Sequence, residues 1–322
     1  GYTGSSVYAG IACGPPVAGF VAGWLGWQWL FWGSALASVG VLLLMKYRVK
    51  LEWRMAKGKP FDWKGCLAYA AAMTCLTFGA SELAAAPALA GGLLAAFVGL
   101  MVVFCIKELK SDYPLLDLRL LARNRVFALS SLAAFINYTA FFGIVFFFSL
   151  YLQFGRGMTV QQAGLFLALQ SVVQVMTTPV AARLCSRFEP GKVSAAGIAL
   201  CGLGLVVSGL LRVDSPMYVL VAAQCLLGMG ISLFALPNTT IILESAGRDR
   251  VGQAAGLTGA VRTGGQLFNM AVITLTLGFY LGSEPAGAHN IDAFMGAMRV
   301  DLIVFGVLNL LAVGCALARN RH

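Results

Sequence analysis

Ten segments of this sequence are apolar over the length that is needed to cross a lipid bilayer. A spanning helix takes about 20 mostly apolar residues, and turns with Gly or Pro separate several of the segments. The chain is 59% hydrophobic and 11% charged, whereas about a quarter of the residues in a soluble domain are charged. We therefore predict an all-α polytopic membrane protein. The predicted spans cover residues 2–22, 29–45, 65–83, 87–106, 126–152, 162–182, 193–211, 217–243, 253–281 and 295–318.

The positions of Lys and Arg indicate how these spans are oriented. Cytoplasmic loops collect Lys and Arg, and the two longest basic loops are 46–64 and 107–125. If every span crosses, only Arg156, Arg212 and Arg299 fall on the opposite side. We expect both ends of this chain to be cytoplasmic in a cell membrane. The basic loops, which account for much of the net charge of +10, would then face an anionic leaflet, and no nucleic-acid partner is expected.

Residues that would support catalysis, metal binding or ATP hydrolysis are scarce. The two histidines are His289 and His322, which excludes histidine-rich metal sites. No P-loop occurs, and the eight cysteines form no CxxC pair, which is typical of small core side chains. Most of the thirteen acidic residues lie in predicted loops or near the ends of spans. We therefore expect a protein that is not an enzyme and that uses no cofactor or metal.

Amide side chains lie inside four of the predicted spans. An amide in hydrocarbon is costly unless it bonds to a neighbouring helix or lines a wet cavity. Each single amide fits interhelical hydrogen bonding, but polar faces on four helices favour a shared substrate cavity. Phe141 and Phe142 would be its apolar walls, and Arg262, nearer the cytoplasm, would pair with Glu244. The predicted cavity amides are Asn137, Gln170, Gln174, Gln224, Asn238, Gln266 and Asn269.

Several motifs resemble those of one transporter family. GIACGPPVAGF resembles the GxxxGPxxGG motif on the fifth helix of major facilitator drug:proton antiporters, with Ala18 where a glycine is usual. FDWKG, residues 61–65, is similar to the FDWxG that opens two extra central helices in the family's fourteen-helix branch. YPLLDLRLLARNRVFAL, YLQFGRGMTVQQAGL and GMGISLFALPNTT resemble later signatures of that branch. The matching residues of the first motif are Gly10, Gly14, Pro15 and Gly19.

The resemblance covers nearly the whole chain and implies major-facilitator helical bundles that begin here at about the fifth helix. Residues 1–45 would be the last two helices of a first bundle. Residues 46–125 would hold two cytoplasmic loops and the two extra central helices, and residues 126–322 a complete six-helix second bundle. In the family, the fifth-helix motif packs against the second bundle and is thought to close the outer half against leak.

A second set of positions resembles the family's gating pattern. ARLCSRFEPGK is similar to the cytoplasmic pattern GxLADRxGRK, with Arg183 and Arg187 in register. Ser186 replaces the aspartate of that pattern, which puts a gating salt bridge through that position in doubt. Arg262 falls on the same predicted side of the membrane.

The function that the resemblance implies is secondary active transport. It would be a proton-coupled efflux of drugs or other lipophilic and amphipathic solutes by alternating access. Its partners would be a small solute, protons and the lipid bilayer, the protein would be a monomer, and the proton-carrying acids would lie on earlier helices. One alternative is transport of a specific polar metabolite. Another is a non-transporting structural protein or a membrane enzyme.

Overall fold

The structure, a computed structural model, describes residues 2–48, 62–83, 85–111, 114, 116, 118–247, 250–282 and 284–319. Of residues 2–9, 11, 12 and 15 it describes the backbone alone. Phe61 of the FDWKG motif, most of the basic loop 46–64, and His322 therefore lie outside the described residues, as does the side chain of Pro15.

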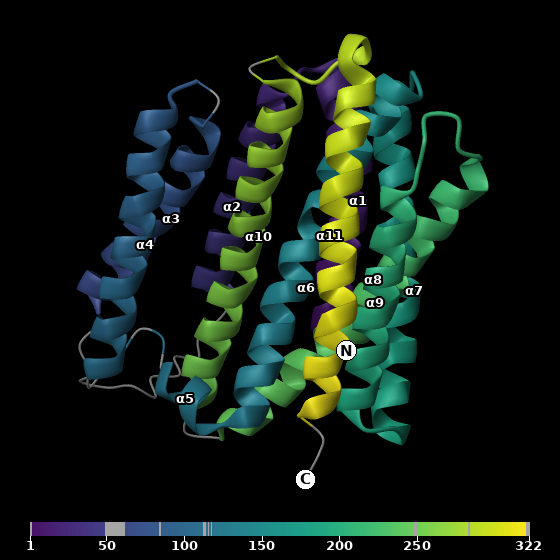
Figure 1. The fold of residues 1–322 in the computed structure, drawn as a ribbon. Helices are drawn as coiled ribbons and strands as arrows, with labels where there is room; N and C mark the ends of the chain where they lie inside the picture. The colour runs from purple at the N-terminus through teal and green to yellow at the C-terminus, as the bar shows by residue number, and fades with distance from the viewer. Residues whose placement is uncertain are drawn as a thin grey trace.

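Long helices run side by side along one common direction (Figure 1). Each of the ten predicted spans coincides with one of them, and no strand occurs among the described residues, so the all-α prediction is confirmed. Eight described helices, all but α1 and α3 of the ten, have the length and mean hydropathy of a membrane span. The long helices are α1 (Tyr2–Trp24), α2 (Gln28–Arg48), α3 (Trp63–Ser81), α4 (Pro87–Lys110), α6 (Arg125–Leu150), α7 (Val160–Arg187), α8 (Pro190–Gly209), α9 (Met217–Ala246), α10 (Val251–Leu281) and α11 (Ile291–Ala318).

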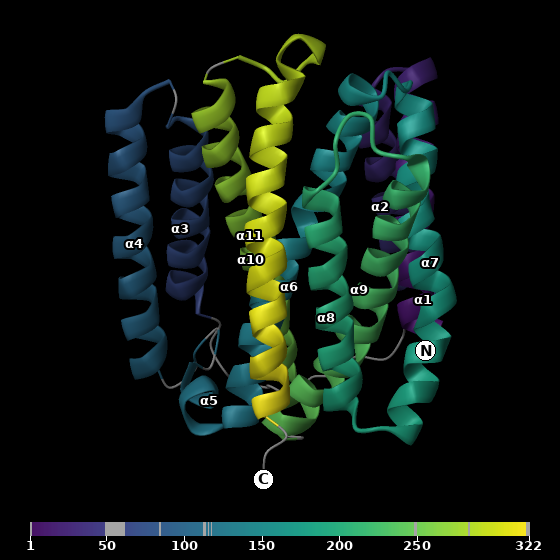
Figure 2. The same cartoon turned by 45° about the vertical axis from the view of Figure 1, so that its right-hand side comes forward.

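Three short elements complete the described chain. The helix α5 (Leu118–Arg123) precedes α6, the π-helical turn η1 (Tyr151–Gly155) continues α6, and the 3-10 turn η3 (Ala288–Asn290) precedes α11. Successive long helices alternate in direction, so that α5 and the C-terminal end of α11 lie at the same end of the molecule (Figures 1 and 2). We call this the α5 end.

Side-chain caps explain where several helices begin. The first backbone N–H groups of a helix lack intrahelical partners, and Asn, Asp or Thr just before the helix can accept from them. Asn124 Oδ1 accepts from the backbone N–H of Phe127 at the start of α6, at 3.0 Å. Thr159 and Gln162 form a reciprocal capping box at the start of α7. These polar residues interrupt the apolar runs close to where the predicted spans 126–152 and 162–182 begin.

Helices α6–α11, which we call the C-terminal group, pack around α8 and α6. Helix α8 lies between α9 and α11, while α10 and α11 both pack against α6, and α7 packs against α9. Helix α1 lies along α7, and the α3–α4 hairpin lies against α10, on the other side of the group (Figure 2). The interior is apolar and rich in aromatic rings, including the fully buried Phe147, Phe148, Phe234 and Phe294.

Glycines let α8 approach its neighbours at backbone distance. A Cβ atom added at Gly197 would lie 2.8 Å from the carbonyl oxygen of Gly230 on α9. On the other side of α8, a Cβ added at Gly202 would lie 3.1 Å from the carbonyl oxygen of Gly306 on α11. Small residues allow this approach in membranes, where close packing takes over the role that the hydrophobic effect has in water.

Candidate functional site

The amide of Asn137 bonds to another helix. Asn137 is fully buried on α6, and its Nδ2 donates to Oδ1 of Asn309 on α11 at 3.0 Å. Asn309 is also fully buried. For this residue the structure supports the interhelical alternative, because the amide that was expected to face a cavity faces α11.

The amide of Asn238 belongs to a network at the α5 end. Its Nδ2 donates to the backbone carbonyl of Ser130 at 3.1 Å, and its Oδ1 accepts from Nη1 of Arg319 at 2.7 Å. Arg319 also donates to Ser130 Oγ at 3.0 Å and to the carbonyl of Gly191 at 3.3 Å. This network joins α6, α8 and α9 to the residue that follows α11.

Arg319 is an unusual cation because the partners recorded for it among the described residues are all neutral. The side chain is buried, and this burial lowers the pKa of Arg319 to about 10. The guanidinium therefore still carries its charge at neutral pH. Sequence reasoning treated Arg319 as one more loop cation, because its partners Asn238 and Gly191 are far away along the chain.

The remaining amides lie on α7, α9 and α10. Gln170 and Gln174 are buried on α7, and Gln266 on α10 is partly buried. The buried side chains of Gln224 and Asn269 have no hydrogen-bond partner among the described residues. Asn269 packs against Gly143, where an added Cβ would lie 2.6 Å from its Oδ1. A wet cavity shared by these amides stays a prediction.

The structure also places the other residues predicted to belong to the cavity, which are Phe141, Phe142 and Arg262. Phe141 is partly buried and packs against the buried apolar interior, whereas Phe142 is 44% exposed. Arg262 is exposed on α10, and no ion pair joins it to Glu244 in the part of the chain that the structure describes. The expected Arg262–Glu244 pair is therefore absent from this conformation.

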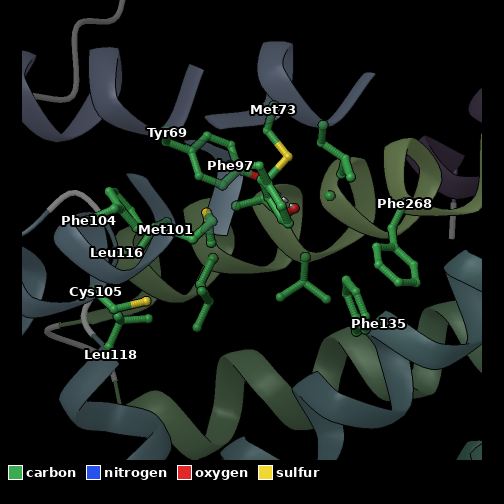
Figure 3. Close-up of a pocket in the computed structure, with 15 residues that line it drawn as sticks. Tyr69, Met73, Phe97, Met101, Phe104, Cys105, Leu116, Leu118, Phe135 and Phe268 are labelled. Atoms are coloured by element: carbon green, nitrogen blue, oxygen red, sulfur yellow. Dashed lines mark hydrogen bonds between the residues drawn. The ribbon is translucent and has the colours of Figure 1, made fainter. Parts of the chain in front are cut away.

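A pocket of about 220 Å³ lies between the α3–α4 hairpin and helices α6 and α10 (Figure 3). Its lining is aliphatic, aromatic and sulfur-containing, and it includes no charged residue. Tyr69 supplies one polar atom at its edge, and this hydroxyl donates to the carbonyl of Ala260 at 3.3 Å. The large side chains that Figure 3 shows around the space include Tyr69, Met73, Phe97, Met101, Phe135 and Phe268.

This pocket was not predicted from the sequence, because the predicted cavity rested on polar residues in apolar spans. A weak signal was present, since Tyr69 and Met73 on α3, and Phe97 and Met101 on α4, are four residues apart and share a helix face. Nothing in the sequence indicated that these two faces would meet Phe268 of α10. None of the predicted cavity amides lines this pocket.

The glycine motif of α1 contacts α7 through its second half. A Cβ added at Gly19 would lie 3.1 Å from the carbonyl oxygen of Val160, and one at Gly23 would overlap the Gln161 side chain. Around Gly10 and Gly14 no atom of the described chain lies within 4 Å of an added Cβ. Within the motif, the close approach is therefore restricted to Gly19 in this structure, and Gly23, three residues beyond the motif, continues the contact.

The basic residues of the gating pattern are exposed at the α5 end of α7. Arg183 and Arg187 have no ion pair among the described residues. Ser186, which replaces the aspartate, bonds to the carbonyl of Arg183 within its own helix at 2.8 Å. A gating role for Arg183 and Arg187 stays a prediction.

The FDWKG motif builds a polar junction at the α5 end of the α3–α4 hairpin. Asp62 caps α3 by accepting from the backbone N–H of Gly65 at 2.9 Å, and it forms a salt bridge with Lys107 of α4. The Lys107 ammonium and the Gly65 N–H hold the pKa of Asp62 below its usual range. Next to it, the buried Glu108 accepts from the backbone N–H of Leu116 at 2.8 Å. The junction links the two helices of the hairpin to each other and to Leu116.

One acidic side chain lies deep within α11. Asp301 is 3% exposed, and its Oδ1 accepts from the hydroxyl of Thr276 on α10 at 2.8 Å. Its Oδ2 has no hydrogen-bond partner among the described residues. Asp301 was not among the residues predicted from the sequence to be functional, although it falls six residues inside the predicted span 295–318. An acid inside an apolar span is itself a signal of function.

Comparison with known proteins agrees with a helical bundle of this kind. A family model of the Major Facilitator Superfamily matches residues 1–270 and, in a second match, residues 130–319. The chain belongs to the Major Facilitator Superfamily. The predicted resemblance is therefore confirmed at the level of the family.

Three individual members of the family show which of its proteins this chain is similar to. The chain is 29% identical over 273 residues to the tetracenomycin C resistance and export protein of Streptomyces glaucescens, covering 81% of this chain and 49% of that protein. It is 24% identical to the riboflavin transporter RibZ of Clostridioides difficile, covering 81% of this chain and 57% of that protein. An uncharacterized transporter of Escherichia coli, YebQ, is 30% identical, with 83% of this chain and 58% of that protein covered.

The chain spans about half to three fifths of the length of these relatives. Other relatives include a multidrug resistance protein B homolog of Mycobacterium tuberculosis and a methylenomycin A resistance protein of Streptomyces coelicolor. These names place the chain with the drug-efflux branch of the Major Facilitator Superfamily and among transporters rather than enzymes.

Proposed function

We propose that the protein of which this chain is part exports lipophilic or amphipathic solutes in exchange for protons. The observation that carries the choice of solute is the apolar pocket between the α3–α4 hairpin and helices α6 and α10. Burying apolar area yields roughly 25 cal/mol per Å². A polar metabolite in the same place would lose its hydrogen bonds to water without replacing them.

The proposal also includes the arrangement of the transport machinery. Residues 1–45 belong to a first bundle, 46–125 to the central segment with its two extra helices, and 126–322 to a second bundle. Alternating access is a rocking of the two bundles about a site near mid-membrane. In this chain the contact of α1 with α7 would then be part of the boundary between them.

The orientation follows from the basic residues. Lys107, Arg125, Arg187 and Lys192 stand at helix termini at the α5 end, and cytoplasmic loops collect such residues. We therefore place the α5 end at the cytoplasmic face of a cell membrane. The solute, protons and the lipids around the protein are its partners, and a monomer contains the complete transport unit.

The test uses the full-length protein in sealed proteoliposomes. An imposed pH gradient should drive movement of Nile red, a neutral lipophilic dye, and movement of the dye should in turn dissipate the gradient. Dye flux that ignores the gradient would exclude proton coupling. A flux that is selective for small charged or highly polar solutes would favour the metabolite alternative.

Two variants on one helix test the role of the pocket. Met73→Trp fills the pocket, since Met73 lines it, and should sharply reduce dye flux. Leu67→Trp is the matched control, because Leu67 lies on the same helix, is 67% exposed and does not line the pocket. Equal flux in both variants would remove the pocket from the transport route.

A further inference from the structure

The buried acid on α11 lies far from either end of its helix. At 1.5 Å per residue, Asp301 is about 15 Å from Ile291 along the α11 axis and about 25 Å from Ala318. Met298, Leu302 and Phe305, its neighbours on the same helix, are buried and apolar. The carboxyl is therefore surrounded by core, and only the Thr276 hydroxyl is recorded as donating to it.

No cation compensates this carboxyl in the part of the chain that the structure describes. The elements packed against α11 are α6, η1, α8, α10 and η3. None of their titratable or charged side chains, nor any on α11, has a recorded hydrogen bond or ion pair with Asp301. Those side chains are Arg125, Tyr138, Tyr151, Lys192, Cys201, Arg262, Tyr280, His289, Asp292, Arg299 and Cys315.

An ionised carboxylate in these surroundings is strongly disfavoured. A buried charge without a partner costs several kcal/mol, so such a group holds a proton instead. In the protonated form Oδ1 still accepts from Thr276, and Oδ2 carries the hydrogen. The single bond to Thr276 and the unpartnered Oδ2 suit a carboxylic acid better than a carboxylate.

A pocket at the end of the molecule opposite the α5 end extends along the first turns of α11 toward this group. This pocket of about 340 Å³ is lined by residues of the α8–α9 loop and the start of α11, among them Asp214, Asp292, Gly296 and Arg299. Arg299 precedes Asp301 by two residues, which is about 3 Å along the axis. Along the axis of α11, Asp301 therefore lies within two residues of the lining of this pocket.

We propose that Asp301 is a proton-binding site of the C-terminal group. The carboxylate takes up one proton to give the neutral acid that this packing favours, and it releases that proton when α10 and α11 separate enough to admit water. This proposal rests on the proposed proton-coupled function, for which it names a carrier in the described chain. Thr276 acts as a positioning residue that orients the carboxyl through its hydroxyl.

The direct test is pH-difference infrared spectroscopy on the full-length protein in lipid. The C=O stretch of a protonated carboxylic acid should be present at neutral pH and absent from Asp301→Asn. Asp292→Asn is the matched control, because Asp292 is an exposed acid on the same helix, and the band should persist in it. A band that is missing in the native protein, or that survives Asp301→Asn, overturns the proposal.

A second variant keeps the acid and removes only the bond to it. Thr276→Val should retain the band at a shifted frequency, and the pH at which the band disappears should rise, because the hydroxyl no longer stabilises the carboxylate. This variant also covers the case in which Asp301→Asn fails to fold. An unchanged band in Thr276→Val would contradict the assignment to Asp301.

Measurements of transport distinguish a failure of this proposal from a failure of the proposed function. Asp301→Asn should weaken the dependence of Nile red flux on the pH gradient, while Asp292→Asn should leave it unchanged. If the infrared band behaves as expected but native flux ignores the gradient, the proton site stands and proton-coupled export fails. If native flux follows the gradient and Asp301→Asn does not alter it, Asp301 is not the carrier.

Discussion

Asn137 and Asn309 face each other across the contact of α6 with α11, with 3.0 Å between Nδ2 of the first and Oδ1 of the second. The other oxygen of the pair, Asn137 Oδ1, and the other nitrogen, Asn309 Nδ2, have no partner among the described residues. The two amides therefore depend on each other. Interhelical polar bonds of this kind contribute on average about 0.6 kcal/mol in a membrane protein.

Substituting one or both asparagines tests this dependence. Asn137→Leu or Asn309→Leu alone should cost about 1–3 kcal/mol, because the remaining amide is buried without a partner. The double substitution should cost less than the sum of the two. Unfolding measurements in bicelles on the four proteins give the coupling energy. Strictly additive losses would mean that the amides act independently, as separate cavity residues would.

The glycine contact between α8 and α9 gives a second prediction. Gly230→Ala places a Cβ 2.6 Å from the backbone nitrogen of Cys201, so the helices must separate, at a cost of about 1–3 kcal/mol. Gly259→Ala on α10 has nothing within 4 Å among the described residues and should be neutral or stabilising by up to about 1 kcal/mol. Thermal unfolding in detergent compares them. A tolerant Gly230 would contradict the close crossing.

The salt bridge at the base of the hairpin predicts a dependence on pH. The pKa of Asp62 is lowered in the folded protein by Lys107 and the Gly65 N–H. Its contribution to stability is therefore complete above the ordinary pKa of an aspartate. It is lost as the pH falls through the lowered folded pKa. Proteolysis of the hairpin should accelerate over that acidic range in the native protein but not in Asp62→Ala.

Two variants at this position separate the cap from the charge. Asp62→Asn keeps a side chain that caps helices well, so it should lose only the ion pair, at most about 1 kcal/mol for a partly exposed bridge. Asp62→Ala should lose about 1 kcal/mol more, because the cap goes as well. Equal losses would show that the cap contributes nothing.

The orientation can be tested by labelling. Single cysteines at Lys57, which lies outside the described residues, and at His289 should react with an impermeant thiol reagent from opposite sides of the membrane. The full-length protein without its native cysteines provides the background. Because His289 lies in the α10–α11 connection, opposite the α5 end, it should be external. Labelling from one side only would contradict the alternation of spans.

The positions of the helices were predictable because bilayer thickness imposes a length on apolar runs. The predicted span 217–243, for example, lies within α9, whose last residues up to Ala246 extend beyond it. The pattern of apolar residues along a helix does not indicate which other helix each of its faces will contact. Asn238 was assigned to a cavity, yet it bonds to Arg319, 81 residues away. Similarly, the motif on α1 predicted close packing but not that Gly19, rather than Gly14, would meet α7.

The backbone contacts of α8 restrict how this molecule can change shape. Gly197 against Gly230 on one side, and Gly202 against Gly306 on the other, bring the backbone of α8 into close contact with α9 and α11. We therefore expect these three helices to move together as one rigid unit. A movement that opens the molecule must occur where larger side chains separate the elements, as between the α3–α4 hairpin and α10. Helices α8, α9 and α11 would then move as a unit, and the relative movement would occur at the edges of the C-terminal group.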